Sequence, residues 1–391
     1  MTNKNIIIYR DALLPYSETF IPAQVENYSC YTGFYVGNSR CTGKKYPLPP
    51  QRTLILSEQA KLTLKRKTLF LLTGWGYRDW IQTLKQLSPQ LIHAHFATDA
   101  VWTLPLKLQL NIPLIVTCHG HDVTASNRTK EDLIRLYGDN PWPQMYLGLQ
   151  QRLFDTADCC IAVSEFIRNK AIARGCPADK IRVEYIGVDV EKLSPDPSII
   201  RQPIVLFVGR LVEYKGCQYL IQAMAEVQSI IPELELVIIG DGEQRSFLEN
   251  QAANLLKRYQ FLGVQPASSV KDWMNRSMLL CSPSFTDDKE TSEGLPITIL
   301  EAQAMNLPVM GSSHAGIPEA VIHGETGRLF PEKDYQALAQ SIVNLAQNPQ
   351  LREQYANAAR KRLEKLFNLK NNIRRIEKIY DTVITEFQNK A

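Results

Sequence analysis

Short runs of almost entirely apolar residues recur along the chain, and a polar or glycine-containing segment follows most of them. Runs of this kind are typical of parallel strands that are buried on both faces of a sheet. Between two of them, residues 98–110 fit a helix, which gives a strand–helix–strand order. The pattern predicts an α/β fold with parallel sheets, and the expected strands are residues 5–9, 91–96, 113–118, 157–164, 181–185, 204–208, 234–239 and 278–281.

The length of the chain and the spacing of these runs predict two domains. A chain of 391 residues is too long for one ordinary hydrophobic core. Residues 194–197, Ser-Pro-Asp-Pro, have the composition of a linker. We therefore predict a Rossmann-like domain at residues 1–197, a second at residues 198–371 and an amphipathic closing helix within residues 372–391. Residues 30–55 are rich in Pro and Gly and are expected to be irregular.

The most informative stretch is residues 283–302, where a polar loop leads from a strand into a helix. Pro296 suits the first helical turn, and Gly294 lets the backbone approach a ligand. The free N–H groups of that turn form an anion site. Glu293 and Glu301 are separated by roughly 10–12 Å along the helix, about the reach of a polyol, a diphosphate and a ribose in a row. The alternative is an ordinary helix start with two solvated carboxylates.

A second candidate site is the loop after the strand at residues 204–208, which begins with Gly209-Arg210 and ends with Lys215-Gly216. The glycines permit a tight loop. The two cations suit a phosphate, because Arg presents a planar fork and Lys a compact charge. Together they would stabilise a departing diphosphate. An ordinary surface loop with two solvated cations is the alternative.

Two weaker signals follow later strands. Gly240 and Gly242 give a Gly-x-Gly pattern before a helix, which is half of a dinucleotide-binding fingerprint and is weak without its third glycine. Residues 261–264 form a short strand with a glycine turn that ends at Val264. The backbone there is a candidate for reading a nucleotide base.

In the N-terminal half, polar residues again follow buried strands. His119 and Asp122 come directly after the run at residues 113–118, where site residues of α/β sheets are expected. His93 and His95 would share one strand face, which raises a metal cluster as an alternative. No later pair of ligands has suitable spacing, so we predict no metal site. The loop after the first strand adds three polar candidates, Ser17, Glu18 and Thr19.

The composition restricts the class of protein. Hydrophobic residues make up 45% of the chain and charged residues 21%, and no apolar run has the length of a membrane span. The start of the chain also lacks the pattern of a signal peptide. We therefore expect a soluble cytoplasmic protein whose eight cysteines are reduced and structural. A net charge of +4 gives little support for nucleic-acid binding, and we expect none.

The positive charge is concentrated in the first hundred residues, which hold 12 Lys or Arg and 6 Asp or Glu. Four of these cations lie among leucines and a phenylalanine in residues 61–70. Such a face suits an anionic membrane or an acidic acceptor. A solvated helix face is the alternative, and the four cations are Lys61, Lys65, Arg66 and Lys67.

Taken together, these motifs resemble the retaining nucleotide-sugar glycosyltransferases of family 4, over nearly the whole chain and most closely at residues 204–330. The resemblance implies the GT-B fold, in which two Rossmann-like domains with parallel sheets face each other across a cleft. It implies that residues 1–197 bind the acceptor, that residues 198–371 bind a nucleotide diphosphate sugar, and that the closing helix returns to the N-terminal domain.

The resemblance also assigns roles to individual residues. Arg210 and Lys215 match the pair that holds the donor diphosphate, and Glu293 matches the carboxylate facing the donor sugar. Glu301 matches the group that bonds the ribose. His119 matches a histidine that faces the donor sugar. The other donor-side candidates are Gly209, Gly240, Gly242, Val264, Gly294 and Leu295, and the acceptor-side candidates are Ser17, Glu18, Thr19 and Asp122.

Two departures from the family pattern stand out. Residues 16–21, Tyr-Ser-Glu-Thr-Phe-Ile, replace the glycine pair that many members have after the first strand. This variant resembles a bacterial branch that builds exopolysaccharides and polymers of the colanic-acid type. Ile186 stands where an Asn is usual before Gly187-Val188-Asp189, so we assign no role there.

The sequence therefore predicts a retaining hexosyltransferase with a UDP-, GDP- or ADP-sugar donor and no required cofactor. Its acceptor would be a glycan or a lipid-linked oligosaccharide, with peripheral contact between the N-terminal domain and an anionic membrane at its inner face as a further hypothesis. Two alternatives stay open at this point. One is a related enzyme such as a nucleotide-sugar epimerase or a glycan phosphorylase, and the other is a non-catalytic protein that binds nucleotide sugars or glycans.

Overall fold

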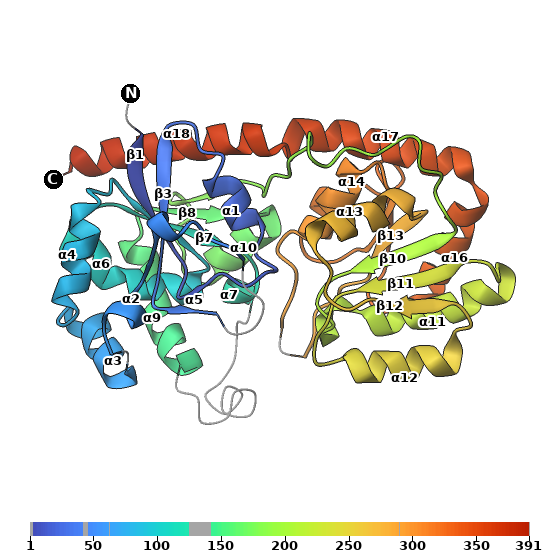
Figure 1. Cartoon of the computed structure of the whole chain (residues 1–391), viewed down its shortest axis with the longest axis horizontal. Coiled ribbons are helices and arrows are strands. Elements are labelled where there is room, and N and C mark those ends of the chain that lie inside the picture. Colours follow the sequence, from blue (N-terminus) through green and yellow to red (C-terminus); the bar gives the residue numbers. More distant parts are fainter. Residues whose placement is uncertain (1–2, 42–45, 62, 125–141, 289, 391) are drawn as a thin grey trace. The chain divides into compact units, whose positions relative to one another are not determined.

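The computed structural model describes residues 3–41, 46–61, 63–124, 142–288 and 290–390 (Figure 1). The chain divides into two compact units. The N-terminal unit comprises Met1–Tyr185 and Lys370–Ala391, and the C-terminal unit comprises Ile186–Leu369. The limits proposed from the sequence, after residues 197 and 371, lie a short way beyond these two boundaries.

The N-terminal unit is built on a seven-stranded sheet in which every pairing is parallel. The strands run in the order β5-β3-β1-β6-β7-β8-β9. Two short strands, β2 and β4, pair separately. The strands are β1 (Lys4–Tyr9), β2 (Ala12–Leu13), β3 (Tyr31–Gly37), β4 (Ser39–Arg40), β5 (Thr53–Ile55), β6 (Ile92–His95), β7 (Leu114–Cys118), β8 (Cys159–Ala162) and β9 (Ile181–Val183).

Helices connect these strands and supply the other half of the core. Isoleucines of β1 and tyrosines of β3 pack with apolar residues of the last helix in one buried cluster. The helices of this unit are α1 (Phe20–Val25), α2 (Leu56–Gln59), α3 (Leu64–Thr73), α4 (Arg78–Gln86), α5 (Ala97–Ala100), α6 (Leu104–Leu110), α7 (His121–Thr124), α9 (Trp142–Thr156), α10 (Glu165–Ala173) and α18 (Leu369–Gln388), with 3-10 turns at Pro50–Arg52 and Val101–Thr103.

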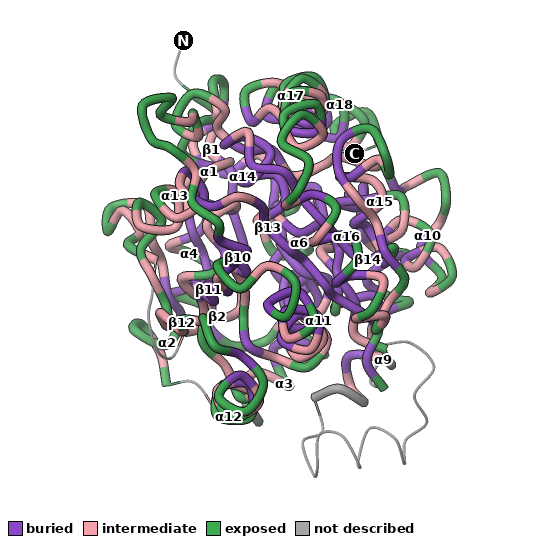
Figure 2. The backbone as a smooth tube through the Cα atoms, turned by 90° about the vertical axis from the view of Figure 1, so that its right-hand side faces the viewer, coloured by how far each residue is buried: buried purple, intermediate pink, exposed green. Residues whose placement is uncertain are grey.

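The C-terminal unit contains a six-stranded parallel sheet in the order β12-β11-β10-β13-β14-β15. The four inner strands of this sheet, β11, β10, β13 and β14, are almost wholly buried, whereas α12 carries many exposed residues (Figure 2). The strands are β10 (Ile204–Val208), β11 (Glu235–Ile239), β12 (Tyr259–Phe261), β13 (Leu279–Ser282), β14 (Val309–Ser312) and β15 (Arg328–Phe330).

Within this unit, α11 and α14 lie on opposite sides of the sheet (Figure 1). The reason is that α11 leads to a strand on one side of the central pair and α14 to a strand on the other, while both crossovers keep the same hand. The helices are α11 (Cys217–Ile230), α12 (Arg245–Leu255), α13 (Ala267–Arg276), α14 (Ile297–Ala304), α15 (Ile317–Ala320), α16 (Tyr335–Gln347) and α17 (Pro349–Leu366), with a 3-10 turn at Glu213–Lys215.

The predicted α/β class with two parallel, Rossmann-like sheets is confirmed, and several details differ. Residues 30–55 are not irregular throughout, because β3, β4 and β5 lie in the described parts of this range. The helix expected at residues 98–110 is divided into α5, a 3-10 turn and α6. Pro296 is the N-cap residue of α14, with extended backbone, and not part of its first turn. Its ring nevertheless stands at a helix start, where a missing N–H is tolerated.

The C-terminal helix α18 belongs to the N-terminal unit and is held there by buried polar contacts. Glu377 accepts hydrogen bonds from the backbone N–H groups of Ser29 and Cys30, both at 2.7 Å. The Tyr380 hydroxyl lies 2.6 Å from the Tyr28 hydroxyl and 2.6 Å from His93 Nδ1. Because burial lowers the pKa of His93 to about 3, this contact involves a neutral imidazole.

Replacing Glu377 with Ala should destabilise the N-terminal unit. The change leaves two backbone N–H groups without their acceptor, which costs about 2–3 kcal/mol of the free energy of unfolding. Urea unfolding of the full chain would measure it. Glu386→Ala is the matched control, because that glutamate is exposed on the same helix. Equal midpoints for the two variants would contradict the role given to Glu377.

Candidate active site

The strand order of the C-terminal sheet reverses between β10 and β13, its two central strands. Successive strands continue outward through β11 on one side and through β14 on the other. In open parallel sheets, ligands bind outside the carboxyl ends of the strands at such a point. The loop after β10 carries Lys215, and the loop after β13 carries Glu293. Parallel pairing of the two strands therefore brings both residues to the same edge.

Lys215 and Glu293 form a buried ion pair at this edge. Lys215 Nζ lies 2.5 Å from Glu293 Oε1, and the Ser284 hydroxyl donates to the same oxygen at 2.9 Å. Burial alone would raise the pKa of Glu293, but Lys215 and Ser284 hold it below its usual value. Burial would lower the pKa of Lys215, whereas the Glu293 carboxylate raises it. Both groups are therefore charged at neutral pH.

His314 completes this cluster and was not singled out from the sequence. Its Nε2 accepts from the Glu293 backbone N–H at 3.4 Å, and its Nδ1 lies 3.0 Å from a Glu332 carboxylate oxygen. These contacts together require the proton on Nδ1. The signal that would have identified His314 is its position directly after β14, at the same edge of the sheet.

Arg210 shares the loop with Lys215 but has a different partner. Its Nη2 donates to the Tyr214 hydroxyl at 2.7 Å. Lys215 Nζ lies 5.6 Å from the centre of the Tyr214 ring, so the two cations flank one aromatic side chain. The structure therefore places Arg210 on Tyr214 and Lys215 on Glu293. Tyr214 has no distinctive sequence signal, since a single aromatic residue in a loop is common.

The candidate glycines bring loops close together. At Gly240, with φ of +142°, a Cβ atom would lie 1.8 Å from the Gly209 carbonyl oxygen. At Gly242 it would lie 2.4 Å from the Leu211 carbonyl oxygen. Any larger residue would push the loops after β10 and β11 apart. The Gly-x-Gly pattern therefore has a packing role in this fold, whatever ligand the loops bind.

The remaining donor-side candidates lie in α14 or just before it, apart from Val264, which follows β12. Glu301 lies within α14 and is partly buried. Among the described residues, its carboxylate has no hydrogen-bond or ion-pair partner. Burial raises its pKa to about 7. Leu295 is buried and Val264 is 38% exposed at the carboxyl end of β12. Gly294 is buried beside Glu293.

In the N-terminal unit, His119 follows β7 and contacts three other rings. His119 Nε2 lies 3.0 Å from His95 Nδ1, and the rings of Phe20 and Phe96 have their centres 4.9 Å and 4.5 Å away. Burial, together with nearby His93 and Arg10, holds the pKa of His119 well below its usual value, so the ring is neutral. His119 Nδ1 has no hydrogen-bond partner among the described residues.

Asp122 supports this histidine through the backbone. Its carboxylate accepts hydrogen bonds from the N–H groups of Ala97, His119 and Gly120. It is 2% exposed, so its oxygens are already engaged in holding the loops after β6 and β7. Asp122, which we predicted on the acceptor side, therefore lies behind His119 and positions its backbone.

Glu18, another acceptor-side candidate, belongs to an ion-pair cluster. Arg10 at the end of β1 binds Glu18 through Nε at 3.0 Å and Nη2 at 2.7 Å. Arg10 also pairs with Asp99, and burial raises the pKa of that carboxyl to about 6. Arg10 and Asp99 were missed because they are far apart in sequence. Ser17 is exposed, and Thr19 is the N-cap of α1 without a side-chain capping bond.

The histidines of β6 do not form a metal cluster with suitable ligands. Within the described ranges, no group of three or more His, Cys, Asp or Glu side chains is placed to hold an ion. His93 contacts Thr117 Oγ1 at 2.6 Å as well as Tyr380. All eight cysteines are free thiols, and six of them are buried.

The basic segment of α3 is only partly a solvated face. Lys65 and Arg66 are exposed, and Arg66 lies over the ring of Tyr77. Lys67 instead lies 3.2 Å from Asp11 Oδ1 and over the Trp102 ring. Leu62 lies outside the described residues. No described helix combines the length and hydropathy that crossing a bilayer requires.

The ion pair between Lys215 and Glu293 yields a stability prediction. Lys215→Ala leaves a buried carboxylate without its partner and should cost about 3–5 kcal/mol of the free energy of unfolding. A Lys215→Met and Glu293→Gln double variant should recover most of this loss, because it buries no charge. Urea unfolding of the full chain measures both, with exposed Lys257→Ala as control. A double variant as unstable as Lys215→Ala would show that the pair does not account for the loss.

Two family models match the chain. The model described as "Glycosyl transferases group 1" matches residues 190–362, and the model "Glycosyltransferase Family 4" matches residues 43–192. Together they span residues 43–362, so the chain carries a glycosyltransferase family 4 segment followed by a glycosyltransferase group 1 segment.

Two similar proteins carry names from bacterial polysaccharide synthesis. The amylovoran biosynthesis glycosyltransferase AmsK of Erwinia amylovora is 34% identical over 56% of this chain and 54% of its own length. WcaL of Escherichia coli, named for colanic acid biosynthesis, is 31% identical over 52% of this chain and 51% of its own length. The chain thus spans about half the length of these curated relatives.

Solved structures share the fold along nearly the whole chain. HepE of Anabaena, solved in complex with UDP-glucose, has a TM-score of 0.74 at 20% identity, covering 97% of this chain and 99% of HepE. Sucrose-phosphate synthase of Thermosynechococcus elongatus has a TM-score of 0.74 at 20% identity, covering 98% and 100%. These similarities confirm the GT-B fold class.

Proposed function

We propose that this protein is a retaining glycosyltransferase that moves a hexose from a nucleotide diphosphate sugar to a sugar hydroxyl. The observation that carries the proposal is the buried Lys215–Glu293 pair at the switch point of the C-terminal sheet, followed along α14 by Glu301. A cation and two carboxylates in this order suit a diphosphate, a sugar and a ribose. The names of the relatives favour exopolysaccharide biosynthesis, and UDP-glucose bound to HepE favours a nucleotide-sugar donor.

In this proposal, the protein's own charges stabilise the leaving group. Lys215 turns from Glu293 to the diphosphate as negative charge develops there, and Arg210 adds a second cation from the same loop. The Glu293 carboxylate then accepts from hydroxyls of the transferred sugar. His119, as a neutral imidazole with a free Nδ1, is proposed to hydrogen-bond that sugar. The acceptor, a glycan or a lipid-linked oligosaccharide, is assigned to the N-terminal unit.

Retention of anomeric configuration is proposed to proceed without a covalent intermediate. Glu293, the carboxylate proposed to face the sugar, is paired with Lys215 and Ser284, and its lowered pKa makes it a weak nucleophile. Attack from the same face that the diphosphate leaves then lets the leaving phosphate take the acceptor proton. No metal or cofactor is required in this scheme.

Nucleotide binding is the first test. UDP, GDP, ADP and their common sugars would be screened by thermal unfolding. We expect one base to raise the Tm by about 5 °C at a concentration about a hundredfold above its Kd. The shift should vanish in Lys215→Ala and persist in Lys257→Ala. Release of the nucleoside diphosphate when an oligosaccharide is added would then show transfer. The absence of a shift with every nucleotide would overturn the proposal.

The raised pKa of Glu301 predicts a pH dependence of nucleotide binding. Its ionised form accepts hydrogen bonds from ribose hydroxyls, and burial holds its pKa at about 7, so affinity should increase as the pH rises from 6 to 8. Glu301→Gln should bind more weakly and lose this increase. Calorimetric titration at pH 6 and at pH 8 measures the nucleotide affinity of the parent and of the variant. An unchanged pH profile in the variant would remove Glu301 from the ribose site.

The raised pKa of Glu301 also makes folding stability depend on pH. Stability without nucleotide should decrease as the pH rises, whereas nucleotide affinity should increase. Because the pKa of Glu301 is raised on folding, its contribution is fully present below about pH 4.5 and is lost as the pH rises through about 7. Without nucleotide, Glu301→Gln should therefore unfold at a higher temperature than the parent at pH 8 and at a similar temperature at pH 5. Thermal unfolding without nucleotide is therefore the control that separates the effect of Glu301→Gln on stability from its effect on nucleotide binding.

A further inference from the structure

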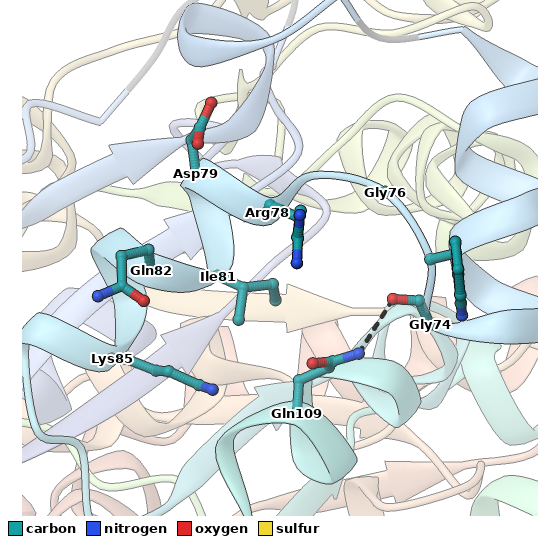
Figure 3. A pocket seen from close by; sticks show the side chains of 9 residues that line it. Gly74, Gly76, Arg78, Asp79, Ile81, Gln82, Lys85 and Gln109 are labelled. Atoms are coloured by element: carbon teal, nitrogen blue, oxygen red, sulfur yellow. Dashed lines mark hydrogen bonds between the residues drawn. The ribbon is translucent and has the colours of Figure 1, made fainter.

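The N-terminal unit contains a hollow that none of the residues discussed so far lines. It has a volume of about 880 Å³ and lies between the end of α3, the exposed side of α4 and the end of α6 (Figure 3). Its size falls within the range of small-molecule sites in proteins. Trp75, Arg78, Lys85 and Gln109 contribute side chains to it.

The backbone around this hollow is fixed on both sides. The helix α3 ends at Gly74, whose φ is +70°, and the Gln109 side chain from α6 donates to the Gly74 carbonyl at 3.1 Å. Tyr77 is buried with its ring 5.4 Å from that of Phe70. The short loop between these anchors presents the Trp75 side chain to solvent, with 77% of the residue exposed. An indole held outward in this way is available for a ligand.

The charge of the hollow is positive. Arg78, Gln82 and Lys85 are spaced to share one face of α4, and that face is exposed. None of these three side chains has a hydrogen bond or ion pair with any described residue. Asp79 is the one carboxylate of the lining, and Figure 3 shows it pointing away from Arg78 and Lys85. The two cations therefore line the hollow without an ion-pair partner among the described residues.

We propose that this hollow binds an anionic saccharide segment of the glycan acceptor, at a subsite separate from the candidate active site. The apolar face of a pyranose ring would lie on the Trp75 indole, because an aromatic ring offers a rigid apolar surface. Arg78 would bind a sugar carboxylate in a bidentate manner, with Lys85 as a second cation. The side-chain amides of Gln82 and Gln109 would serve hydroxyl groups, since an amide both donates and accepts.

A membrane surface fits the same region less well. Leu69 and Leu72 of α3 are exposed nearby, but neither lines the hollow. The lining is concave and rich in amides and charges, and Ile81 and the Trp75 indole are its only apolar side chains among the described residues. A bilayer presents a broad, flat surface, which would not enter a concave hollow or form hydrogen bonds with its side-chain amides. We therefore assign this site to a glycan.

The assignment rests on the proposed function only in taking a glycan as the acceptor. A subsite that holds a distant part of the acceptor binds substrate and transition state equally, so it lowers KM without changing kcat. A Trp75→Ala variant should therefore raise KM for a long acidic acceptor by about tenfold and leave kcat unchanged. A monosaccharide acceptor, which cannot reach the subsite, should show no change.

Direct binding would be measured without nucleotide sugar, so that it does not depend on turnover. Oligogalacturonate is the acidic probe, and malto-oligosaccharide of equal length is the neutral one. Calorimetric titration of the full chain at low salt should show oligogalacturonate binding that weakens at high salt. Trp75→Ala and Arg78→Ala should each weaken it by about tenfold, and Trp75→Phe should retain most of it. Leu108→Ala is the control, because it is an exposed apolar residue outside the lining.

Several results would overturn the subsite. One is the absence of oligogalacturonate binding, and another is equal weakening by Trp75→Ala and Leu108→Ala. Binding to phosphatidylglycerol vesicles that Leu72→Ala and Trp75→Ala reduce equally, without saccharide binding, would make this face a membrane contact instead. The titration needs no donor, so it tests the subsite separately from sugar transfer. If oligogalacturonate does not bind but sugar transfer is normal, the subsite is wrong and the proposed function stands. If the saccharide binds but no sugar is transferred, the subsite stands and the proposed function is wrong.

Discussion

Parallel pairing of the strands is the constraint on which the arrangement of the candidate site depends. In a parallel sheet, each strand must be followed by a crossover that returns to the opposite edge, so all the loops that follow strands gather at one edge. The C-terminal sheet reverses its order between β10 and β13. The crossovers on either side diverge there, and the loops carrying Lys215 and Glu293 meet in the space between them.

The glycines and the buried charges follow from this crowding. Loops that converge at one edge approach so closely that Gly240 and Gly242 have no room for a side chain. The same closeness buries Glu293 and partly buries Lys215, and a pair of opposite charges is the arrangement that offsets such burial. The N-terminal unit has a similar arrangement of paired charges. Its strand order reverses between β1 and β6, and there Arg10 forms ion pairs with Glu18 and Asp99.

These pairs also keep the groups of the candidate site charged and oriented in the absence of a ligand. Glu293 and Lys215 hold each other ionised, whereas Glu301 has no partner in the described part of the chain and burial raises its pKa to about 7. His119 is kept neutral by burial, and Asp122 fixes its backbone. The candidate site thus has one balanced pair and one unbalanced carboxylate, and an incoming ligand with hydroxyls and phosphates can exchange contacts with both.

The alternation of apolar runs and polar loops was enough to predict the α/β class, most of the strands and the candidates at their carboxyl ends, because burial on both faces leaves a local signature in the sequence. It failed at residues 30–55, where β3, β4 and β5 lie among Pro and Gly residues and tertiary pairing overrides weak local preference. It also predicted a single helix at residues 98–110, which the structure divides into α5, a 3-10 turn and α6. Arg10, Asp99 and His314 were missed because each gains its meaning from a partner distant in sequence.

The sequence by itself determined which residues are available for chemistry at each strand end, since hydrophobic periodicity and loop position are local properties of the chain. Only the tertiary structure decided which of them meet. It pairs Lys215 with Glu293 and Arg210 with Tyr214, and it turns Asp122 into a support for His119. Among the residues that the structure describes, it leaves Glu301 unpaired. The physical reason is that burial and charge pairing depend on distances between segments far apart along the chain, which no local pattern encodes.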